Sequence, residues 1–525
     1  MRELLAAIHY DAWVIPALLA IPLLGAAGIL LFCSQSGPAG RTEHSCGQRT
    51  RTLALWVFGV EFVVSLGLWW AFEPSVVGWQ MRVDWPWLPD LGARFIVGID
   101  GISLFMVLLT TFLMPLAALG DWTSVRTKLR THYALMLVLT TGMIGVFVAL
   151  DLLLFYVMWE IMLVPMYFII GIWGGERRLY ATTKFFVYTL GGSLLMLVAL
   201  IWLWHSSGAT TFAYDAVLAG ATFTPGAALL MFGAFFLAFA IKVPMFPFHT
   251  WLPDAHTEAP TGGSVILAGI MLKMGTYGFL RFALPFFPGV ALDPTVRAII
   301  LGLAVVSILY GALIAMVQPN LKRLVAYSSV SHLGFVMLGI FALTVQSVQG
   351  ALMIMISHGI STAGLFLLVG MLYERTHTLQ ISAFGGIARA VPMFAAALTL
   401  VAMSSIGLPG TNGFVGEFLV LIGTYRTFPA AAIVAAIGVI LAAVYLLWAL
   451  QRVVFNPLIH PDNATLSDLN RRELAVMGTI AAVIIWLGIA PGPVLRRMET
   501  ASSHLVQTVE RRAAIAQAAG ERVVP

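Results

Sequence analysis

A charged residue stands inside an apolar run of this 525-residue chain, just before the run is interrupted. Residues 227–241 are apolar apart from glycine, and the segment KVPMFPFHTWLPDAHTE follows at 242–258. A charge inside a bilayer is costly, so Lys242 indicates a functional site. Pro244 and Pro247 each remove a helix hydrogen bond, and broken helices at membrane depth line water-filled cavities in transporters. This segment therefore predicts ion or proton movement.

Glu160 lies in the middle of the apolar segment LLLFYVMWEIMLVPMYFII, too deep for its carboxylate to reach water. Burial disfavours the charged form of a lysine, and a nearby carboxylate favours it. A lysine held between these two effects can load and release a proton near neutral pH, which is what a relay requires. The alternative for Glu160 is a structural ion pair with an arginine. The alternative for Lys242 is to be a structural partner of Glu160 and nothing more.

Two further lysines lie within apolar segments. Lys273 is in the middle of SVILAGIMLKMGTYGFLRF, again far from either end. Lys184 is only a few residues into its segment and close to Arg177 and Arg178. Its side chain can extend to the membrane surface, so an interfacial role is as well supported as a relay role.

Two histidines, His332 and His358, fall on consecutive apolar segments beside serines and threonines that can hold water. With Lys273 and Glu417 they form one hydrophilic stripe, which favours a proton wire. A haem held by the two histidines is a weaker alternative, and a simple helix–helix hydrogen bond is the structural one. Glu61 and Asp100 lie in or near other apolar segments and are interpreted as structural or interfacial.

The acidic and histidine side chains after Lys242 could suggest a metal site. Their spacing matches no standard ligand set, and the nearby prolines favour a turn at the membrane surface. We therefore expect His249, Asp254, His256 and Glu258 to belong to a loop at the mouth of the broken helix, with His249 on the proton path as a secondary candidate.

Composition predicts a membrane protein throughout. Hydrophobic residues make up 60% of the chain and charged residues 10%, against about 25% in soluble domains. About 14 apolar stretches are long enough to span a bilayer, which predicts an all-α polytopic membrane protein. Only Asp151 separates the fourth stretch from the fifth, so one fused helix is an alternative there. The twelfth stretch, 391–425, contains Gly407, Pro409 and Gly410 and predicts a second broken helix.

Basic residues indicate the orientation. Alternate connections are rich in them, as at Arg126, Lys128 and Lys322, whereas the opposite connections hold few, among them Arg82 and Arg281. By the positive-inside rule the rich set is cytoplasmic and both termini face outward, on the periplasmic side of a bacterial inner membrane. The arginines of the C-terminal tail argue the other way. The net charge of +5 is thus a topological bias, and no nucleic-acid partner is predicted.

The two broken helices lie five spans apart. An odd offset gives opposite orientations, which is the arrangement of an inverted repeat with its sites near the midplane. The chain is therefore expected to divide into four parts: 1–125 with transmembrane helices 1–3, 126–290 with the first five-helix repeat (helices 4–8), 291–455 with the second, inverted repeat (helices 9–13), and 456–525 with the last transmembrane helix and a polar tail.

Several kinds of site are absent from the sequence. There is no P-loop and no dinucleotide fingerprint, and Cys33 and Cys46 are isolated, which excludes a four-cysteine iron–sulfur cluster within this chain. We therefore expect no cofactor and no metal here. The energy for transport must come from an ion gradient or from a partner protein.

The motifs, taken in order, resemble the antiporter-like membrane subunits of the proton-pumping NADH:quinone oxidoreductase, respiratory complex I. They are GIDGIS at 98–103, the Glu160 segment, the whole of 242–282, LKRLVAYSSVSHLGF at 321–335, SHGISTAGLF at 357–366 and GLPGTNGFVGEF at 407–418. The resemblance covers roughly 95–455. Glu417 favours the M-type branch, because the L- and N-type branches and the Mrp antiporter subunits usually carry lysine there.

The resemblance implies a translocase subunit with about 14 spans that couples NADH oxidation and quinone reduction on other subunits to proton transfer. It implies FMN and iron–sulfur clusters on partner subunits, none in this chain, and L- and N-type neighbours in the bilayer. The implied relay residues are Glu160, Lys242, Lys273, His332, His358 and Glu417, with Lys184 and His249 as secondary candidates.

Roles follow from the same resemblance. Glu160 would pair with Lys242 and receive an electrostatic signal from the neighbouring subunit, and Lys242 would carry the proton. Lys273 would form a polar axis with the two histidines, and Glu417 would load the proton that leaves on the outer side. Three other functions stay open: a cation/proton antiporter of the Mrp type, a membrane subunit of a related hydrogenase complex and, more weakly, a quinone-binding enzyme.

Overall fold

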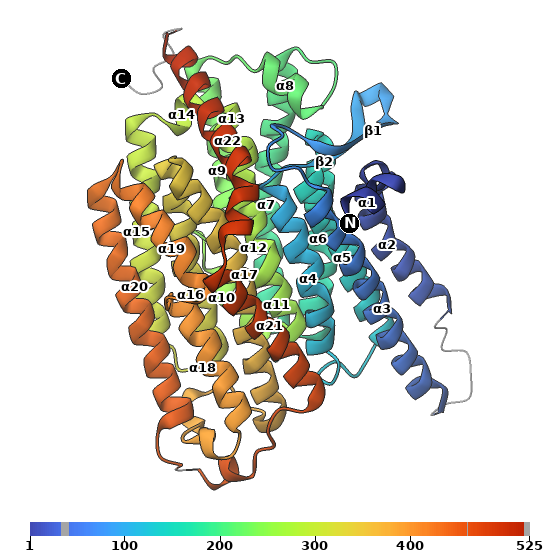
Figure 1. Ribbon diagram of the computed structural model, residues 1–525, viewed down its shortest axis with the longest axis vertical. Helices are drawn as coiled ribbons and strands as arrows, with labels where there is room; N and C mark the ends of the chain where they lie inside the picture. The colour runs from blue at the N-terminus through green and yellow to red at the C-terminus, as the bar shows by residue number, and fades with distance from the viewer. Residues whose placement is uncertain (33–40, 459, 519–525) are drawn as a thin grey trace. The chain divides into compact units, whose positions relative to one another are not determined.

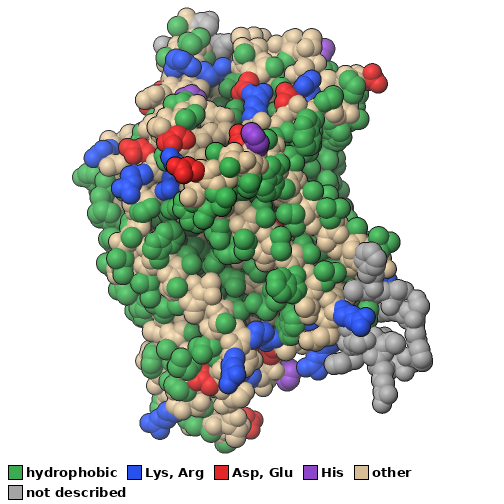
Figure 2. Space-filling model, turned by 45° about the vertical axis from the view of Figure 1, so that its right-hand side comes forward, with side chains coloured by type: hydrophobic (Ala, Val, Ile, Leu, Met, Phe, Trp, Pro, Cys, Tyr) green, Lys and Arg blue, Asp and Glu red, His purple; other side chains and the backbone are tan. Residues whose placement is uncertain are grey.

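The computed structural model describes residues 1–32, 41–458 and 460–518, and helices account for most of them (Figure 1). Within these ranges, 13 helices are long and apolar enough to cross a membrane. Figure 2 shows hydrophobic side chains over most of the face in view, with charged side chains concentrated toward its upper and lower parts. These features confirm the expected polytopic helical membrane protein. Cys33 and residues 519–525 of the expected tail lie outside the described residues.

One of the 14 expected spans, the twelfth stretch, does not form a single long helix. The 391–425 stretch forms α18 (Pro392–Ile406) and α19 (Asn412–Tyr425), neither of which is long enough to span alone. The fused helix considered around Asp151 does not form. The Asp151 carboxylate accepts hydrogen bonds from the backbone N–H groups of Leu153 and Leu154, both at 3.0 Å, and so caps the start of a separate helix, α6.

The chain folds into two compact units. The first contains Met1–Lys242, Met274–Val296 and Arg497–Pro525. Its elements are α1 (Arg2–Ala7), α2 (Tyr10–Phe32), α3 (Arg41–Ala71), β1 (Gln80–Leu88), η1 (Pro89–Leu91), β2 (Ala93–Ile99), α4 (Ser103–Gly120), α5 (Leu129–Val148), α6 (Leu152–Trp173), α7 (Arg178–Ser207), α8 (Tyr214–Gly220), α9 (Pro225–Lys242), η3 (Phe279–Ala283), α13 (Leu284–Phe286) and α14 (Pro288–Ala291).

The second unit contains Val243–Lys273 and Arg297–Arg496. Its elements are α10 (Trp251–Glu258), α11 (Thr261–Ile266), η2 (Leu267–Met271), α16 (Leu321–Ala342), α17 (Val345–Thr376), η4 (Ile381–Ala383), η5 (Ile387–Arg389), α18, α19, α20 (Pro429–Leu450), η6 (Gln451–Phe455), η7 (Pro461–Thr465) and α21 (Arg471–Ile489). The division between the units falls inside α12 (Leu272–Gly278), α15 (Pro294–Met316) and α22 (Gly492–Ala518).

The first unit also contains a two-stranded sheet. Strands β1 and β2 pair antiparallel, with Trp85 opposite Phe95 and their rings stacked at 5.5 Å. Gly92 closes the turn between them with φ at +71°, a conformation that glycine adopts without strain. The sequence analysis treated this stretch as a connection and predicted no strands.

After the last span, residues 492–518 are helical. They form α22, whose Arg497 guanidinium stacks 3.8 Å from the centre of the Trp69 ring and donates to the Trp69 carbonyl at 3.2 Å. The Thr500 hydroxyl donates to the Pro74 carbonyl at 2.6 Å. Arg497 of this segment therefore takes part in packing, whereas Arg496 and Arg511 are exposed.

Arg281 is a correction to the expected topology, which placed it in a polar connection. It is 8% exposed and lies in η3, a π-helical turn, where it pairs with Asp100. Its guanidinium also lies 4.7 Å from the Trp79 ring centre. Removing either partner would leave a buried charge alone. The pair therefore holds the GIDGIS segment, which contains Asp100, against η3.

Candidate functional site

The first helix break places Lys242 at the end of α9. Helix α9 ends at this residue, and regular helix resumes only at Trp251, the first residue of α10, because Pro244 and Pro247 lack the N–H groups that would continue it. The last carbonyls of a helix carry partial negative charge, which favours a cation at this end. Lys242 is 1% exposed, so the broken helix carries its ammonium group away from bulk water.

Aromatic rings and a thioether surround the Lys242 ammonium group. Its Nζ lies 3.6 Å from the Met162 sulfur, 5.5 Å from the centre of the Trp159 ring and 5.7 Å from the centre of the Phe185 ring. The Glu160 carboxylate is near enough for its charge to act on Lys242. Weak cation–π contacts help to hold this lysine in place.

Glu160 lies on α6, half-buried, with its Oε1 atom buried and without a hydrogen-bond partner. One helical turn earlier, Tyr156 interacts through its hydroxyl with Glu160 and with Ser193 of α7. Lys184, on α7, is half-buried and lies 5.6 Å from the Tyr180 ring centre.

In the second unit, Lys273 and His358 are in direct contact. Lys273 is fully buried, and its Nζ lies 2.8 Å from Nδ1 of His358. The same Nζ donates to the carbonyl of Ala268, which belongs to the π-helical turn η2. A π-turn widens the helix and leaves a carbonyl available, so the local backbone helps to hold this lysine.

The two histidines connect Lys273 to Glu417. The rings of His358 and His332 have their centres 5.8 Å apart, and His332 Nδ1 lies 3.1 Å from Oε1 of Glu417. The hydroxyl of Tyr445 lies 3.4 Å from the other ring nitrogen of His332. The structure thus brings four of the expected relay residues together in one buried row.

The second helix break presents Glu417 to this row. Helix α18 ends at Ile406, the following residue Gly407 has φ at +83°, and α19 begins at Asn412. A Cβ atom at Gly407 would lie 2.6 Å from Oε2 of Glu417. Glycine is therefore required here twice, for its backbone conformation and for the close approach of the carboxylate.

A cavity of about 20 Å³ adjoins the row, and that volume suits one water molecule. Its lining includes His332, Ser357, His358, Ser361, Thr362, Ser404 and Glu417. The Nε2 atom of His358 is buried and has no partner among the described residues, so a water in this cavity would satisfy it. The serines near His332 do not share this role: the hydroxyls of Ser328, Ser329 and Ser331 donate to helix carbonyls.

The residues after the first break are not a surface loop, contrary to expectation. They lead into and form α10. His249, two residues before this helix, is 3% exposed, and its ring centre lies 5.1 Å from that of Tyr310. His256 is fully buried, stacks on Phe366 at 4.6 Å, and has no hydrogen-bond partner at either ring nitrogen. The charges of Lys273 and Lys322 both act on it.

His256 was expected in that loop, and its burial on a helix was not predicted. A signal was present, because His249, Leu252 and His256 are spaced three and four residues apart, which is typical of one helix face. Lys322 was likewise expected in a cytoplasmic connection, but it is 6% exposed and donates to the carbonyl of Ala259 at 2.8 Å. Among the described residues, no group of three histidine, cysteine or acidic side chains is arranged to hold a metal ion.

Comparison with known proteins identifies the family. Residues 149–446 match the model of the family described as NADH:quinone oxidoreductase/Mrp antiporter, transmembrane. The chain is 44% identical over 497 residues to NADH-quinone oxidoreductase subunit M of Rhodobacter capsulatus, covering 93% of this chain and 95% of that protein. It is 41% identical to NADH-ubiquinone oxidoreductase chain 4 of Marchantia polymorpha, covering 93% of this chain and 96% of that protein.

Solved structures agree with the sequence matches. A chain of respiratory complex I from Thermus thermophilus superposes with a TM-score of 0.84 at 33% identity, covering 94% of this chain and 99% of that one. A chain of the Mrp complex from Dietzia sp. DQ12-45-1b shares the fold, with a TM-score of 0.80 at 20% identity over 96% of this chain and 99% of that one. This chain therefore belongs to the family of antiporter-like membrane subunits that NADH:quinone oxidoreductases and Mrp antiporters have in common.

Proposed function

We propose that this chain is an M-type proton-translocating subunit of NADH:quinone oxidoreductase. Relatives that carry this description, or the equivalent chain 4, align over more than nine-tenths of the chain at 40% identity and above. The glutamate at 417, where the L- and N-type branches usually carry lysine, supports the same branch. The chain acts as part of a translocase, and the redox chemistry takes place on other subunits.

The observation that carries the proposal is the buried row Lys273, His358, His332 and Glu417. Each member can bind a proton, and successive members are in contact or one water apart. A proton on the Lys273 ammonium can pass to Nδ1 of His358, and the water beside Nε2 can carry it toward His332 and Glu417. Because the row is enclosed by protein, protons do not leak through it freely.

Glu160 and Lys242 supply the control step in this proposal. The negative charge of Glu160 attracts the Lys242 ammonium group. When a neighbouring subunit draws the negative charge of Glu160 away, Lys242 loses that stabilisation and releases its proton. Two residues are secondary members of the path. Lys184 lies at the membrane surface, and His249 follows the first helix break.

The wider assembly follows from the same proposal. Residues 126–290 and 291–455 act as two inverted repeats, each with one broken helix. L- and N-type subunits lie beside the chain in a bacterial inner membrane, with both termini on the periplasmic side. FMN and iron–sulfur clusters on partner subunits oxidise NADH.

A cation/proton antiporter is the second candidate, and the fold shared with the Mrp complex is the observation that favours it. The two functions differ in their energy source. A redox pump moves protons only when NADH is oxidised, whereas an antiporter exchanges protons for cations down an existing gradient.

The test uses inverted membrane vesicles that carry Glu160→Gln, which keeps the side-chain shape and removes the charge. NADH-driven proton pumping, NADH:quinone activity and cation/proton exchange are measured together, with assembly of the complex checked on native gels. We expect pumping and NADH oxidation to fall together in an assembled complex. If both persist and only cation/proton exchange is lost, the chain is an antiporter subunit.

A further inference from the structure

A cavity of about 270 Å³ lies in the first unit, and none of the proposed relay residues lines it. It is formed where α9 begins, where α13 and α14 lie, and by the end of α22, which meet in the upper part of Figure 1. Its lining is largely apolar and includes Phe223, Phe286, Phe287, Pro288 and Ile515. Because one candidate span begins at Pro225 and another ends at Phe286, the cavity lies at a boundary between bilayer and water.

One cation, Arg512, stands in the wall of this cavity. Its Nε atom is buried without a hydrogen-bond partner, and one terminal nitrogen reaches the carbonyl of Ala221 only at 3.4 Å. Burial lowers the pKa of Arg512, and no carboxylate of the described residues offsets this effect. A partly desolvated guanidinium without a counter-ion is unfavourable, so an anion bound beside Arg512 would be stabilising.

The chemistry of the lining restricts which anion fits. A small free anion would satisfy Arg512 but leave an apolar cavity beside it unfilled, and an uncharged apolar molecule would fill the cavity but leave the cation uncompensated. A molecule with a phosphate at one end and a hydrocarbon chain at the other satisfies both, because guanidinium pairs well with phosphate and burial of methylene groups is favourable.

We infer that this cavity binds an anionic phospholipid, with its phosphate on Arg512 and part of one acyl chain among the phenylalanine side chains. The bound lipid fastens the end of α22 to the start of α9 and to α14. This inference does not depend on the proposed function, because a lipid site here serves a redox pump and an antiporter equally.

The test is photo-crosslinking of the purified intact complex with phosphatidylglycerol that carries a photoactivatable group in its acyl chain. Crosslinked peptides are identified by mass spectrometry. In the unmodified chain we expect labelling of the peptides that contain Phe286, Phe287 and Ile515. Arg512→Gln should lower this labelling by roughly tenfold, the effect of losing one charge-assisted contact. Arg511→Gln is the matched control, because Arg511 is exposed and does not line the cavity, and labelling should be retained.

Two further arms distinguish a lipid from other occupants. A photoactivatable diacylglycerol, which lacks the phosphate, should label the cavity weakly, and millimolar inorganic phosphate should not displace phosphatidylglycerol. Ala228→Phe, which fills the cavity and keeps Arg512, should abolish labelling, and it decides the matter if the Arg512 variant does not assemble. Equal labelling by the two lipids, labelling that survives both substitutions, or displacement by free phosphate would each overturn the inference.

Discussion

The Nδ1 atom of His332 lies 3.1 Å from Oε1 of Glu417, and so joins a histidine in the middle of α16 to the carboxylate that follows the second helix break. The contact depends on a chain reversal that only glycine permits at position 407. The fold and the proposed proton path are therefore coupled at this point, and several consequences can be measured.

The first prediction concerns two glycines of the same break. Gly407→Ala and Gly410→Ala both place a side chain at positive φ, +83° and +90°, and each should cost about 1–2 kcal/mol. Only at Gly407 would the new methyl group meet Glu417, because nothing lies within 4 Å of a Cβ at Gly410. We expect Gly407→Ala alone to lose NADH-driven pumping, measured in inverted vesicles. Equal pumping by the two variants would show that the position of Glu417 is unimportant.

The second prediction concerns the contact between Lys273 and His358. Lys273→Met preserves the length of the side chain and removes its charge, and we expect assembly to persist while pumping falls by roughly tenfold or more. His358→Leu should have a similar effect. Because the two act as one step, the double variant should be no worse than either single one. Losses that multiply in the double variant would mean that the residues act on separate paths.

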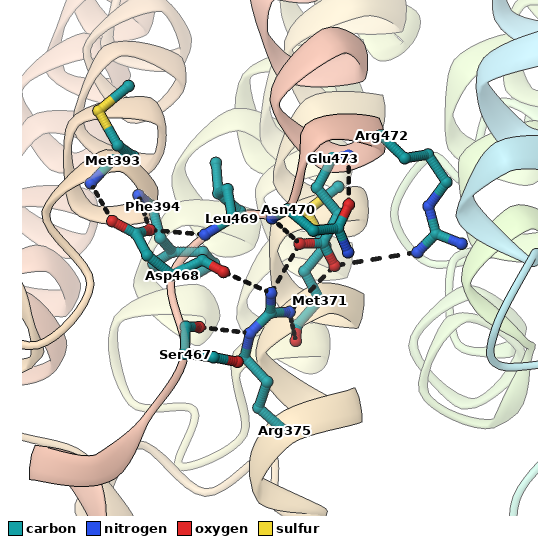
Figure 3. Close-up of polar contacts among 10 residues, drawn as sticks. All are labelled: Met371, Arg375, Met393, Phe394, Ser467, Asp468, Leu469, Asn470, Arg472 and Glu473. Atoms are coloured by element: carbon teal, nitrogen blue, oxygen red, sulfur yellow. Dashed lines mark hydrogen bonds and ion pairs between the residues drawn. The ribbon is translucent and has the colours of Figure 1, made fainter.

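The third prediction concerns the contacts at the end of α17 (Figure 3). Arg375 pairs with Glu473 at 2.6 and 3.0 Å and also donates to the carbonyls of Ser467 and Asp468. Glu473 is 2% exposed and also accepts from the backbone N–H of Asn470. Arg375→Ala leaves this buried carboxylate without its nearest cation and should destabilise the second unit by about 3–5 kcal/mol. Thermal unfolding of the purified complex measures the loss.

Arg472→Gln is the control for this prediction. Arg472 approaches the same carboxylate only at 4.0 Å, and its removal should cost less than about 1 kcal/mol. If both substitutions lower the unfolding temperature equally, the Arg375 contacts do not hold α17 to the start of α21.

The fourth prediction concerns Glu61, a residue outside the proposed path. It is fully buried on α3, and neither carboxylate oxygen has a hydrogen-bond partner. An ionised carboxylate in that position would be very unfavourable, so a neutral amide of the same shape should replace it well. We expect Glu61→Gln to assemble and to pump within about twofold of the unmodified chain, in contrast to Glu160→Gln. Loss of pumping would place Glu61 on the proton path.

Much of this architecture could be predicted from local sequence signals. The spans follow from apolar length, and the two breaks follow from Pro244, Pro247 and the glycines near 407, because these residues have strong local backbone preferences. Lys242 and Glu160 stood out because a charge within an apolar run is rare. Lys273, His332, His358 and Glu417 were expected on one hydrophilic stripe, but the order of their contacts was not predicted, since contacts between distant helices leave no local trace.

Other features were missed for physical reasons. The pairing of β1 with β2 depends on cross-strand contacts such as Trp85 with Phe95, and a short stretch between spans gives little indication of them. Arg281 and Lys322 were expected at the surface because charge was counted by position along the chain. Their burial depends on partners far away in sequence, Asp100 for Arg281 and the carbonyl of Ala259 for Lys322.

The most direct test of the account is the number of protons pumped per NADH oxidised by complexes that carry Glu417→Gln or Glu417→Asp, measured in sealed inverted vesicles. If Glu417 receives the proton from His332, the glutamine variant should lose pumping by roughly tenfold or more, and aspartate, which keeps an acid on a shorter side chain, should retain part of it. Pumping at the unmodified rate and ratio by the assembled glutamine variant would contradict the account.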